Sequence, residues 1–294
     1  MKKLSEFIIE KLIFLSGIAS ILFVLLILVF LLKEGLSLFR TVNPIDFITG
    51  TNWYPISDPP QFGILPLIIG SLFVTFGAIV IAVPLGIASA VYVAEVAPPW
   101  LRDFLKSGIE LLAAIPSIVL GFIGIITLAP FLKSTFNLSS GLTAMAGSIM
   151  LAFMSMPTIV SIIEDSIASV PKSYKEGSLA LGATRWQTIY RVTLPAASSG
   201  ILAAVMLGIG RVVGETMAVL MITGNAAVMP TSMLQPVRTL TATIAAEMGE
   251  AVSGSPHYYS LFAIGIILFI ISFAINLSAD MFLHRSKKKF KVKR

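Results

Sequence analysis

Six long apolar runs constrain this chain more than any other feature of its sequence. A helix that crosses the hydrocarbon core of a bilayer needs about 20 mostly apolar residues. The runs that reach this length are Leu12–Leu32 and, approximately, 64–93, 110–133, 142–163, 198–222 and 258–277. Backbone polar groups in lipid must be hydrogen-bonded internally, which a helix achieves within one segment. The sequence therefore predicts an all-α membrane protein with six transmembrane helices.

Composition excludes the other broad classes of protein. Only 12% of the 294 residues are charged, about half the fraction that is typical of a soluble domain, and disordered chains need lower hydrophobicity. The chain contains no cysteine, which excludes a disulfide scaffold and a thiolate metal site. Its two histidines, His257 and His284, fall on opposite sides of the predicted membrane, so we expect no metal site and no cofactor in this chain.

Basic residues predict the orientation of the spans. With the N-terminus inside, 16 of the 21 Lys and Arg residues fall in cytoplasmic segments, and the positive-inside rule favours this arrangement. The external segments hold only Lys33, Arg40, Lys133 and Arg238, while Arg211 falls within a span. The basic tail, residues 285–294, is typical of a cytoplasmic anchor beside a span and does not indicate nucleic-acid binding.

The same reading divides the chain into four parts. Residues 1–33 form an N-terminal segment with the first span, and residues 34–63 form an external loop that is ordered and rich in turns. Residues 64–284 form the main membrane domain, and residues 285–294 form the basic tail. A second external stretch has a middle, Val237 to Val252, that is compatible with a short helix. Its Glu247 and Glu250 would face solvent or a docking protein.

The cytoplasmic loop at 171–195 is long and has its own helix signals. Ser173 with Glu176, and Thr184 with Gln187, fit two capping boxes, and Gly182 between them suits the left-handed residue that ends a helix. We expect helices from about Tyr174 to Leu181 and from about Arg185 to Thr193, the second stopping before Pro195. Their apolar side chains either dock in a groove of a partner protein or pack beneath the chain's own helices.

These residues resemble a known loop. Glu176-Gly177-Ser178, then Gly182, then Val192-Thr193-Leu194-Pro195 match the spacing of the EAA loop of ABC-importer permeases. In this chain Gly177-Ser178 replaces the Ala-Ala of the family pattern, and Val192 replaces its Ile. The resemblance implies a coupling loop, with Glu176, Gly182, Leu194 and Pro195 as its marker residues.

Other motifs narrow the resemblance to the PstC-type permease subunits of phosphate importers. They include Leu112-Ala113-Ala114-Ile115-Pro116-Ser117, the Gly210–Ala218 segment and the Met217–Asn225 segment. The likeness implies the type I importer permease fold (MetI-like) in the inner membrane of a prokaryote. It implies a PstA-type sister permease, two cytoplasmic PstB-type ATPase subunits that hold ATP and Mg, and an external PstS-type phosphate-binding protein. This chain has no Gly-x-x-x-x-Gly-Lys-[Ser/Thr] motif, so ATP hydrolysis is expected on a separate subunit.

Arg211 and Glu215 are the candidate substrate-path residues. Four residues apart on one predicted helix, they would share a face. A basic residue at the centre of a span costs about 2.5–3.5 kcal/mol on insertion scales, more than the roughly 0.2–0.5 kcal/mol that an exposed helix pair returns. The pair either holds two helices together or forms an anion site. In the second case the Arg211 guanidinium would bind phosphate and Glu215 would weaken that binding.

Three prolines fall inside predicted spans: Pro84, Pro116 and Pro157. Each is either a static kink or part of a gate. In the second case Ser117 and Ser155 would be anion donors near the path. Gly210 and Gly214, which flank Arg211, have the spacing of close helix packing.

Three other functions remain open from the residues alone. One is a membrane scaffold that transports nothing, although Arg211 and Glu215 argue against it. A permease for a related oxyanion would use the same charges. An ion-gradient-driven carrier would be expected to show repeated halves with paired broken helices, and the loop at 171–195 argues against it.

Overall fold

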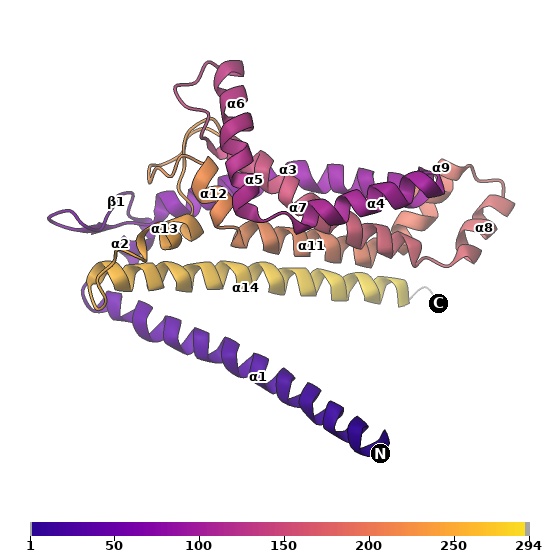
Figure 1. The fold of residues 1–294 in the computed structure, drawn as a ribbon, viewed down its shortest axis with the longest axis horizontal. Helices are drawn as coiled ribbons and strands as arrows, with labels where there is room; N and C mark the ends of the chain where they lie inside the picture. The colour runs from indigo at the N-terminus through magenta and orange to yellow at the C-terminus, as the bar shows by residue number, and fades with distance from the viewer. Residues whose placement is uncertain (1, 292–294) are drawn as a thin grey trace.

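The computed structural model describes residues 2–291, except for the side chains of residues 2–6, 8, 279, 280 and 282–291. It is an elongated bundle of helices (Figure 1). A hairpin of β1 (Trp53–Tyr54) and β2 (Gln61–Phe62) lies at one end, and α8 (Lys172–Ala180) lies at the other. We call these the external and cytoplasmic ends, following the orientation predicted from the basic residues.

Two long helices form one side of the molecule. They are α1 (Lys2–Ser37) and α14 (Pro256–Lys291), which meet near the external end and diverge toward the cytoplasmic end, where both chain termini lie (Figure 1). Phe30 and Phe262 pack edge to face, with ring centroids 5.4 Å apart. Most described side chains of α1 before residue 31 are exposed within this chain, so its apolar side chains there are available to lipid. Helix α14 runs without a break through residue 285, where the sequence placed the start of a separate tail.

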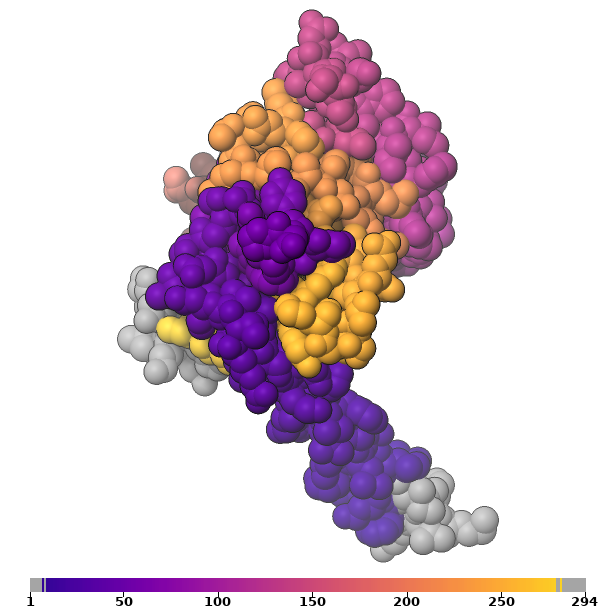
Figure 2. All heavy atoms as spheres, turned by 90° about the vertical axis from the view of Figure 1, so that its left-hand side faces the viewer, coloured from indigo at the N-terminus to yellow at the C-terminus, as the bar shows by residue number. Residues whose placement is uncertain are grey.

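The external loop is ordered, and its apolar residues explain why. It contains η1 (Leu38–Arg40), α2 (Pro44–Thr49) and the hairpin. Asn43 caps α2, since its side chain accepts the Ile45 amide at 2.9 Å and Pro44 occupies the first turn. An external core, defined here by Leu38, Phe47, Trp53, Phe62, Ile64, Leu240, Leu261 and Ile264, joins this loop to later parts of the chain. Figure 2, viewed from the external end, shows the loop beside the segment that precedes α14.

Helices α3 (Leu65–Val91) and α7 (Ala144–Ala168) form the centre of the bundle. Thr143 caps α7 by accepting the Ala146 amide. Glycines allow the two helices to approach closely: a Cβ at Gly77 would lie 2.4 Å from the Ser148 hydroxyl, and one at Gly86 would lie 2.8 Å from Ile159. Both positions therefore tolerate no larger residue without a shift of the helices.

The three in-span prolines behave differently from one another. Pro84 lies inside α3 and Pro157 inside α7, and both helices continue past them. Pro116 separates α4 (Pro99–Ala114) from α5 (Ser117–Ile123), so the predicted third span is broken there. The chain continues through η3 (Gly124–Leu128) into α6 (Ala129–Thr135), which points away from the bundle (Figure 1).

The predicted fifth span is also interrupted. Helix α11 (Ser198–Gly214) ends before Glu215, and α12 (Met217–Ile222) starts a new direction. Before α11, the helical segment Arg185–Ala196 comprises α9 (Arg185–Thr188), η4 (Ile189–Thr193) and α10 (Leu194–Ala196). This segment meets α11 at an angle of 69°. By length and composition, five helices of the described chain are candidates to cross a membrane, or six if this bent pair is one span.

The second external stretch contains α13 (Leu240–Glu247), a shorter helix than the predicted one. Thr239 caps it by accepting the Ala242 amide at 3.2 Å. The first turn of α13 is buried against α12 and α3, while its C-terminal end lies near the start of α14. The helix thus connects the broken fifth span to the external core.

Candidate functional site

Arg211 lies on an open face of α11. Its guanidinium is exposed within this chain and donates one hydrogen bond, from Nη1 to the Thr158 hydroxyl of α7 at 2.8 Å. Thr158 follows Pro157, whose ring cannot donate a backbone hydrogen bond. The contact joins two central helices through a neutral partner. Most of the five donors of the guanidinium therefore remain free for a ligand.

Glu215 is not the partner of Arg211, and the predicted shared helix face is wrong. Helix α11 ends at Gly214, and Glu215 adopts an extended conformation with φ −69° and ψ 133°. The Glu215 carboxylate instead accepts the Ala218 amide at 3.3 Å, at the start of α12. Its carbonyl accepts the Thr241 hydroxyl of α13 at 2.8 Å. The i,i+4 relation needs a continuous helix, and the break at Glu215 removes it.

The glycines around Arg211 also differ from the expectation. Close packing occurs at Gly208, where a Cβ would lie 2.6 Å from Ile159. A Cβ at Gly210 or Gly214 would have no atom of another described segment within 4 Å. These two glycines thus leave the surface on both sides of Arg211 open, which is the opposite of a packed helix contact.

The two predicted serine donors lie in different surroundings. Ser117 is the half-buried first residue of α5, directly after the break at Pro116. Ser155 lies one turn before Thr158 on α7, but it is 1% exposed and its hydroxyl donates to the Ala152 carbonyl at 3.1 Å. In this conformation Ser155 is enclosed, and the structure brings neither serine into contact with Arg211.

The loop at 171–195 forms the predicted helix, glycine and helix. Gly182 has φ +85°, as the left-handed position requires. The second capping box is present, with Thr184 and Gln187 exchanging hydrogen bonds. The first is wrong: α8 starts at Lys172 after Pro171, no side chain caps it, and Glu176 is exposed. Pro195 does not end the second helix, because it lies in the first turn of α10, where a missing amide costs little.

Several apolar side chains of this loop are exposed, including Leu181 at 91%, Trp186 at 68% and Tyr190 at 73%. Ile189 and Leu194 do pack against the chain's own core. The exposed group favours the first of the two alternatives, in which a partner protein covers the tip of the loop.

Ion pairs that the sequence did not reveal fasten the cytoplasmic end. Lys175 of α8 contacts Glu95 in η2 (Tyr92–Val96) at 2.6 Å. Glu164 of α7 accepts from both Arg102 and Lys106 of α4, at 2.5 and 2.8 Å. The pKa of Lys106 is raised, chiefly because its ammonium hydrogen-bonds to Glu164 and then to Asp165. These contacts join α8 to η2, and α4 to α7, at the base of the bundle.

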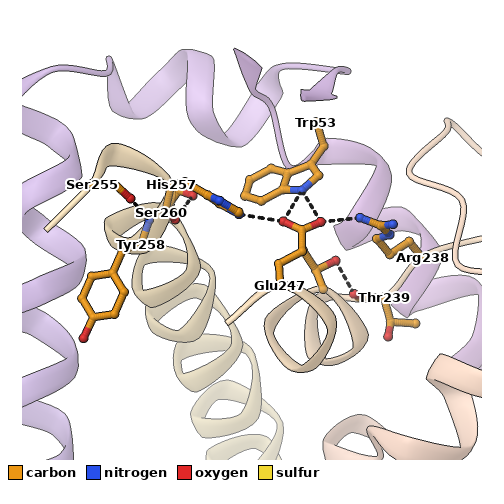
Figure 3. Close-up of polar contacts among 9 residues, drawn as sticks. Trp53, Arg238, Thr239, Glu247, Ser255, His257, Tyr258 and Ser260 are labelled. Carbon is orange, nitrogen blue, oxygen red and sulfur yellow. Dashed lines mark hydrogen bonds and ion pairs between the residues drawn. The ribbon is translucent and has the colours of Figure 1, made fainter. Parts of the chain in front are cut away.

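A second polar cluster lies at the external end and is centred on Glu247 (Figure 3). The Trp53 indole donates to both carboxylate oxygens at 3.1 Å, Arg238 contacts Oε1 at 2.5 Å, and His257 Nε2 lies 2.9 Å from Oε2. The Glu247 side chain is only 17% exposed. Glu247 therefore faces mainly its three partners and only partly the external surface, whereas Glu250 is exposed.

Sequence reasoning missed Thr158 and the partners of Glu247. The sequence offers a weak signal for Thr158, because it is a polar residue directly after a proline inside a predicted span. Arg238 and His257 lie nine and ten residues from Glu247, beyond a turn of one helix, and Trp53 lies 194 residues away, so no helical spacing relates them.

Comparison with known proteins places the chain in a family. Residues 82–288 match the family model described as binding-protein-dependent transport system inner membrane component. A probable ABC transporter permease protein, YqgH, of Bacillus subtilis is 45% identical over 253 residues, or 85% of this chain and 82% of that protein. The phosphate transport system permease protein PstC of Mesorhizobium japonicum is 38% identical over 286 residues, 89% of this chain and 86% of that protein.

Solved structures of importers share the fold. A chain of a bacterial ABC transporter involved in the import of alginate aligns with a TM-score of 0.64 and 16% identity, covering 92% of this chain and 96% of that chain. A chain of the MetNI methionine ABC transporter in an inward-facing conformation aligns with a TM-score of 0.61 and 20% identity, covering 79% and 99%.

This chain belongs to the binding-protein-dependent transport system inner membrane components. It is a multi-pass permease subunit of an ABC importer in the bacterial inner membrane, and it is not itself an enzyme. A permease of this class works with cytoplasmic ATPase subunits and an external binding protein.

Proposed function

We propose that this chain is the PstC-type permease of an inorganic phosphate importer, with Arg211 contacting phosphate during transport. The observation that supports this role is the surroundings of Arg211. Its side chain is exposed, has one neutral hydrogen-bond partner in the described chain and is flanked by open surface at Gly210 and Gly214. A guanidinium presents paired N–H donors to a tetrahedral oxyanion. The relatives named PstC, at 32–38% identity, support phosphate as the anion.

The surroundings of Arg211 suit release as well as binding. A conducting site must hold its ion weakly enough to let it leave. Thr158 occupies one donor of the guanidinium in the absence of substrate, and an anion would compete with this neutral hydroxyl. Glu215 lies at the break that follows Arg211 and is assigned to the same path. Ser117 and Ser155 are proposed as further donors, which a change of conformation would bring to the path.

A PstA-type sister permease would complete the path opposite Arg211. PstB-type ATPase subunits would dock on the loop at 171–195, and a PstS-type protein would deliver phosphate from outside. In this arrangement Gly182 sets the turn of the coupling loop, Leu194 anchors it to the core and Pro195 starts the turn into α11. Glu176 lies exposed on α8, where it is accessible to the ATPase subunit.

Uptake of labelled phosphate by cells that express the whole transporter tests the substrate. We expect accumulation that depends on ATP, that excess arsenate suppresses and that equal excess sulfate leaves largely unchanged. Arsenate shares the shape and protonation of phosphate, whereas sulfate carries no proton at neutral pH. Equal competition by sulfate would favour a permease for a related oxyanion. Uptake that persists without ATP and follows an ion gradient would instead favour a carrier.

Substitution of Gly182 tests the coupling loop. Gly182→Leu should uncouple ATP hydrolysis from uptake, because a left-handed conformation costs a branched residue roughly 1–2 kcal/mol. Gly182→Asn is the matched control, because Asn has a similar size and tolerates this conformation. ATP hydrolysed per phosphate transported is the measurement. Equal coupling in the Leu and Asn variants would contradict the role of the turn.

A further inference from the structure

The Glu247 cluster adds polar contacts between four external segments, three of which the external core also joins. Trp53 comes from the external hairpin, Arg238 from the segment before α13, Glu247 from the end of α13 and His257 from the first turn of α14 (Figure 3). Arg238 also donates from Nε to the Asn225 carbonyl at 3.0 Å. One carboxylate thus fixes four external segments, and charged hydrogen bonds of this kind are stronger than neutral ones.

The cluster borders a groove on the external face. The groove has a volume of about 530 Å³ and is lined in part by Tyr54, Ile56, Val228, Glu247 and Glu250. Ile56 is 81% exposed and lies on the hairpin connection, beyond the helices that are long enough to cross a membrane. Apolar side chains exposed on such a face are typical of a protein docking surface. In a binding-protein-dependent importer the partner on this side is the external binding protein.

The opposite end of α13 contacts the break in the fifth span. The Thr241 hydroxyl donates to the Glu215 carbonyl at 2.8 Å, and the Leu240 amide donates to the Ser71 hydroxyl of α3 at 2.9 Å. Thr241 and Glu247 are six residues apart, which is roughly 9 Å along a helix. The short helix therefore carries the external cluster at one end and the break beside Arg211 at the other.

We propose that Glu247 is a positioning residue that transmits docking of the external binding protein, through α13 and Thr241, to the break at Glu215 and Thr216. Displacement of the hairpin by the docked protein moves Trp53 and hence Glu247. Helix α13 moves as a unit, because its first turn is capped by Thr239 and buried. The extended residue Glu215 absorbs the change, as hinge residues at element ends do. The inference rests on the importer family and does not depend on which anion is carried.

The measurement is ATP hydrolysis by the complete reconstituted transporter, with and without its own binding protein purified in the anion-loaded form. We expect Glu247→Gln to lower the ratio of stimulated to unstimulated hydrolysis by roughly 2–30-fold. Asp46→Asn is the control, because Asp46 is another exposed carboxylate at the external end, on α2, and it does not line this groove. A wild-type ratio in Glu247→Gln, or an equal loss in Asp46→Asn, would overturn the proposal.

A second variant tests the other end of α13 without disturbing the cluster. Thr241→Val removes the donor to Glu215 and should lower the same ratio, while Thr243→Val, whose hydroxyl bonds only within α13 to the Thr239 carbonyl, should not. This pair decides the question even if Glu247→Gln fails to insert. A merely structural role would lower membrane abundance and would leave the ratio of the inserted transporter unchanged, which would also overturn the proposal.

Discussion

Arg211 and Glu247 are both charged residues in an apolar protein, yet the chain treats them in opposite ways. Glu247 is largely buried and receives Trp53, Arg238 and His257 from three other segments. Arg211 is exposed, and within the part of the chain that the structure describes its one side-chain hydrogen bond is to the Thr158 hydroxyl. A charge that the chain itself neutralises fixes structure, because removing one partner leaves the others unsatisfied. A charge left with free donors is available to a substrate or to another subunit.

The largest expected effect comes from the open charge. Arg211→Gln should lower phosphate uptake by more than about tenfold, because a hydrogen bond to a charged group contributes about 1.5–3 kcal/mol. Membrane abundance should stay unchanged. Arg211→Lys should restore only part of the uptake, since an ammonium cannot present two parallel donors. Lys133→Gln, at an exposed cation on α6, is the control. Normal uptake by Arg211→Gln would remove Arg211 from the path.

The neutralised cluster predicts an effect on stability. Arg238→Gln should lower the free energy of unfolding by roughly 1–3 kcal/mol, because it leaves one acceptor of the Glu247 carboxylate without its charged donor. Arg211→Gln should change stability by less. Thermal unfolding of the two purified variants in the same detergent makes the comparison. If Arg211→Gln proves the more destabilising of the two, the distinction drawn between the two charges does not hold.

Thr158 gives a smaller and more specific effect. Thr158→Val removes the hydroxyl at constant shape, and a neutral hydrogen bond contributes about 0.5–1.5 kcal/mol. Thr158 competes with the anion for the guanidinium. We therefore expect the phosphate concentration that gives half-maximal uptake to fall by roughly 2–10-fold in this variant. Dose–response curves for uptake show this change. An identical curve would mean that Thr158 does not orient Arg211 during transport.

Glu215 should give the smallest effect. Glu215→Gln keeps an oxygen that can accept the Ala218 amide, so uptake should fall by less than about threefold. Combined with Arg211→Gln it should not restore uptake, because no ion pair joins the two residues in the described chain. Recovery of uptake in the double variant would mean that they pair in another conformation, and that Arg211 serves as a structural clamp.

Local features of the sequence were enough to predict the class, the long helices and the helix, glycine and helix of the loop at 171–195. Gly182 and the capping box of Thr184 with Gln187 could be predicted because a left-handed residue and a cap depend on neighbours within a few positions. The apolar runs predicted most spans for the same reason, since lipid imposes its requirement on each segment separately. The resemblance to importer permeases rested on spacings of this local kind.

Only the tertiary structure decided which charges meet. Local spacing placed Arg211 beside Glu215, but the helix ends at Gly214 and the buried turn of α13 draws the Glu215 carbonyl toward Thr241. Glu247 meets Trp53 because the external core packs the hairpin against the segment before α14. Such contacts join residues far apart in the chain, and packing of apolar side chains brings them together. Hydrophobic packing is non-directional, so its outcome depends on the whole fold and cannot be read from one segment.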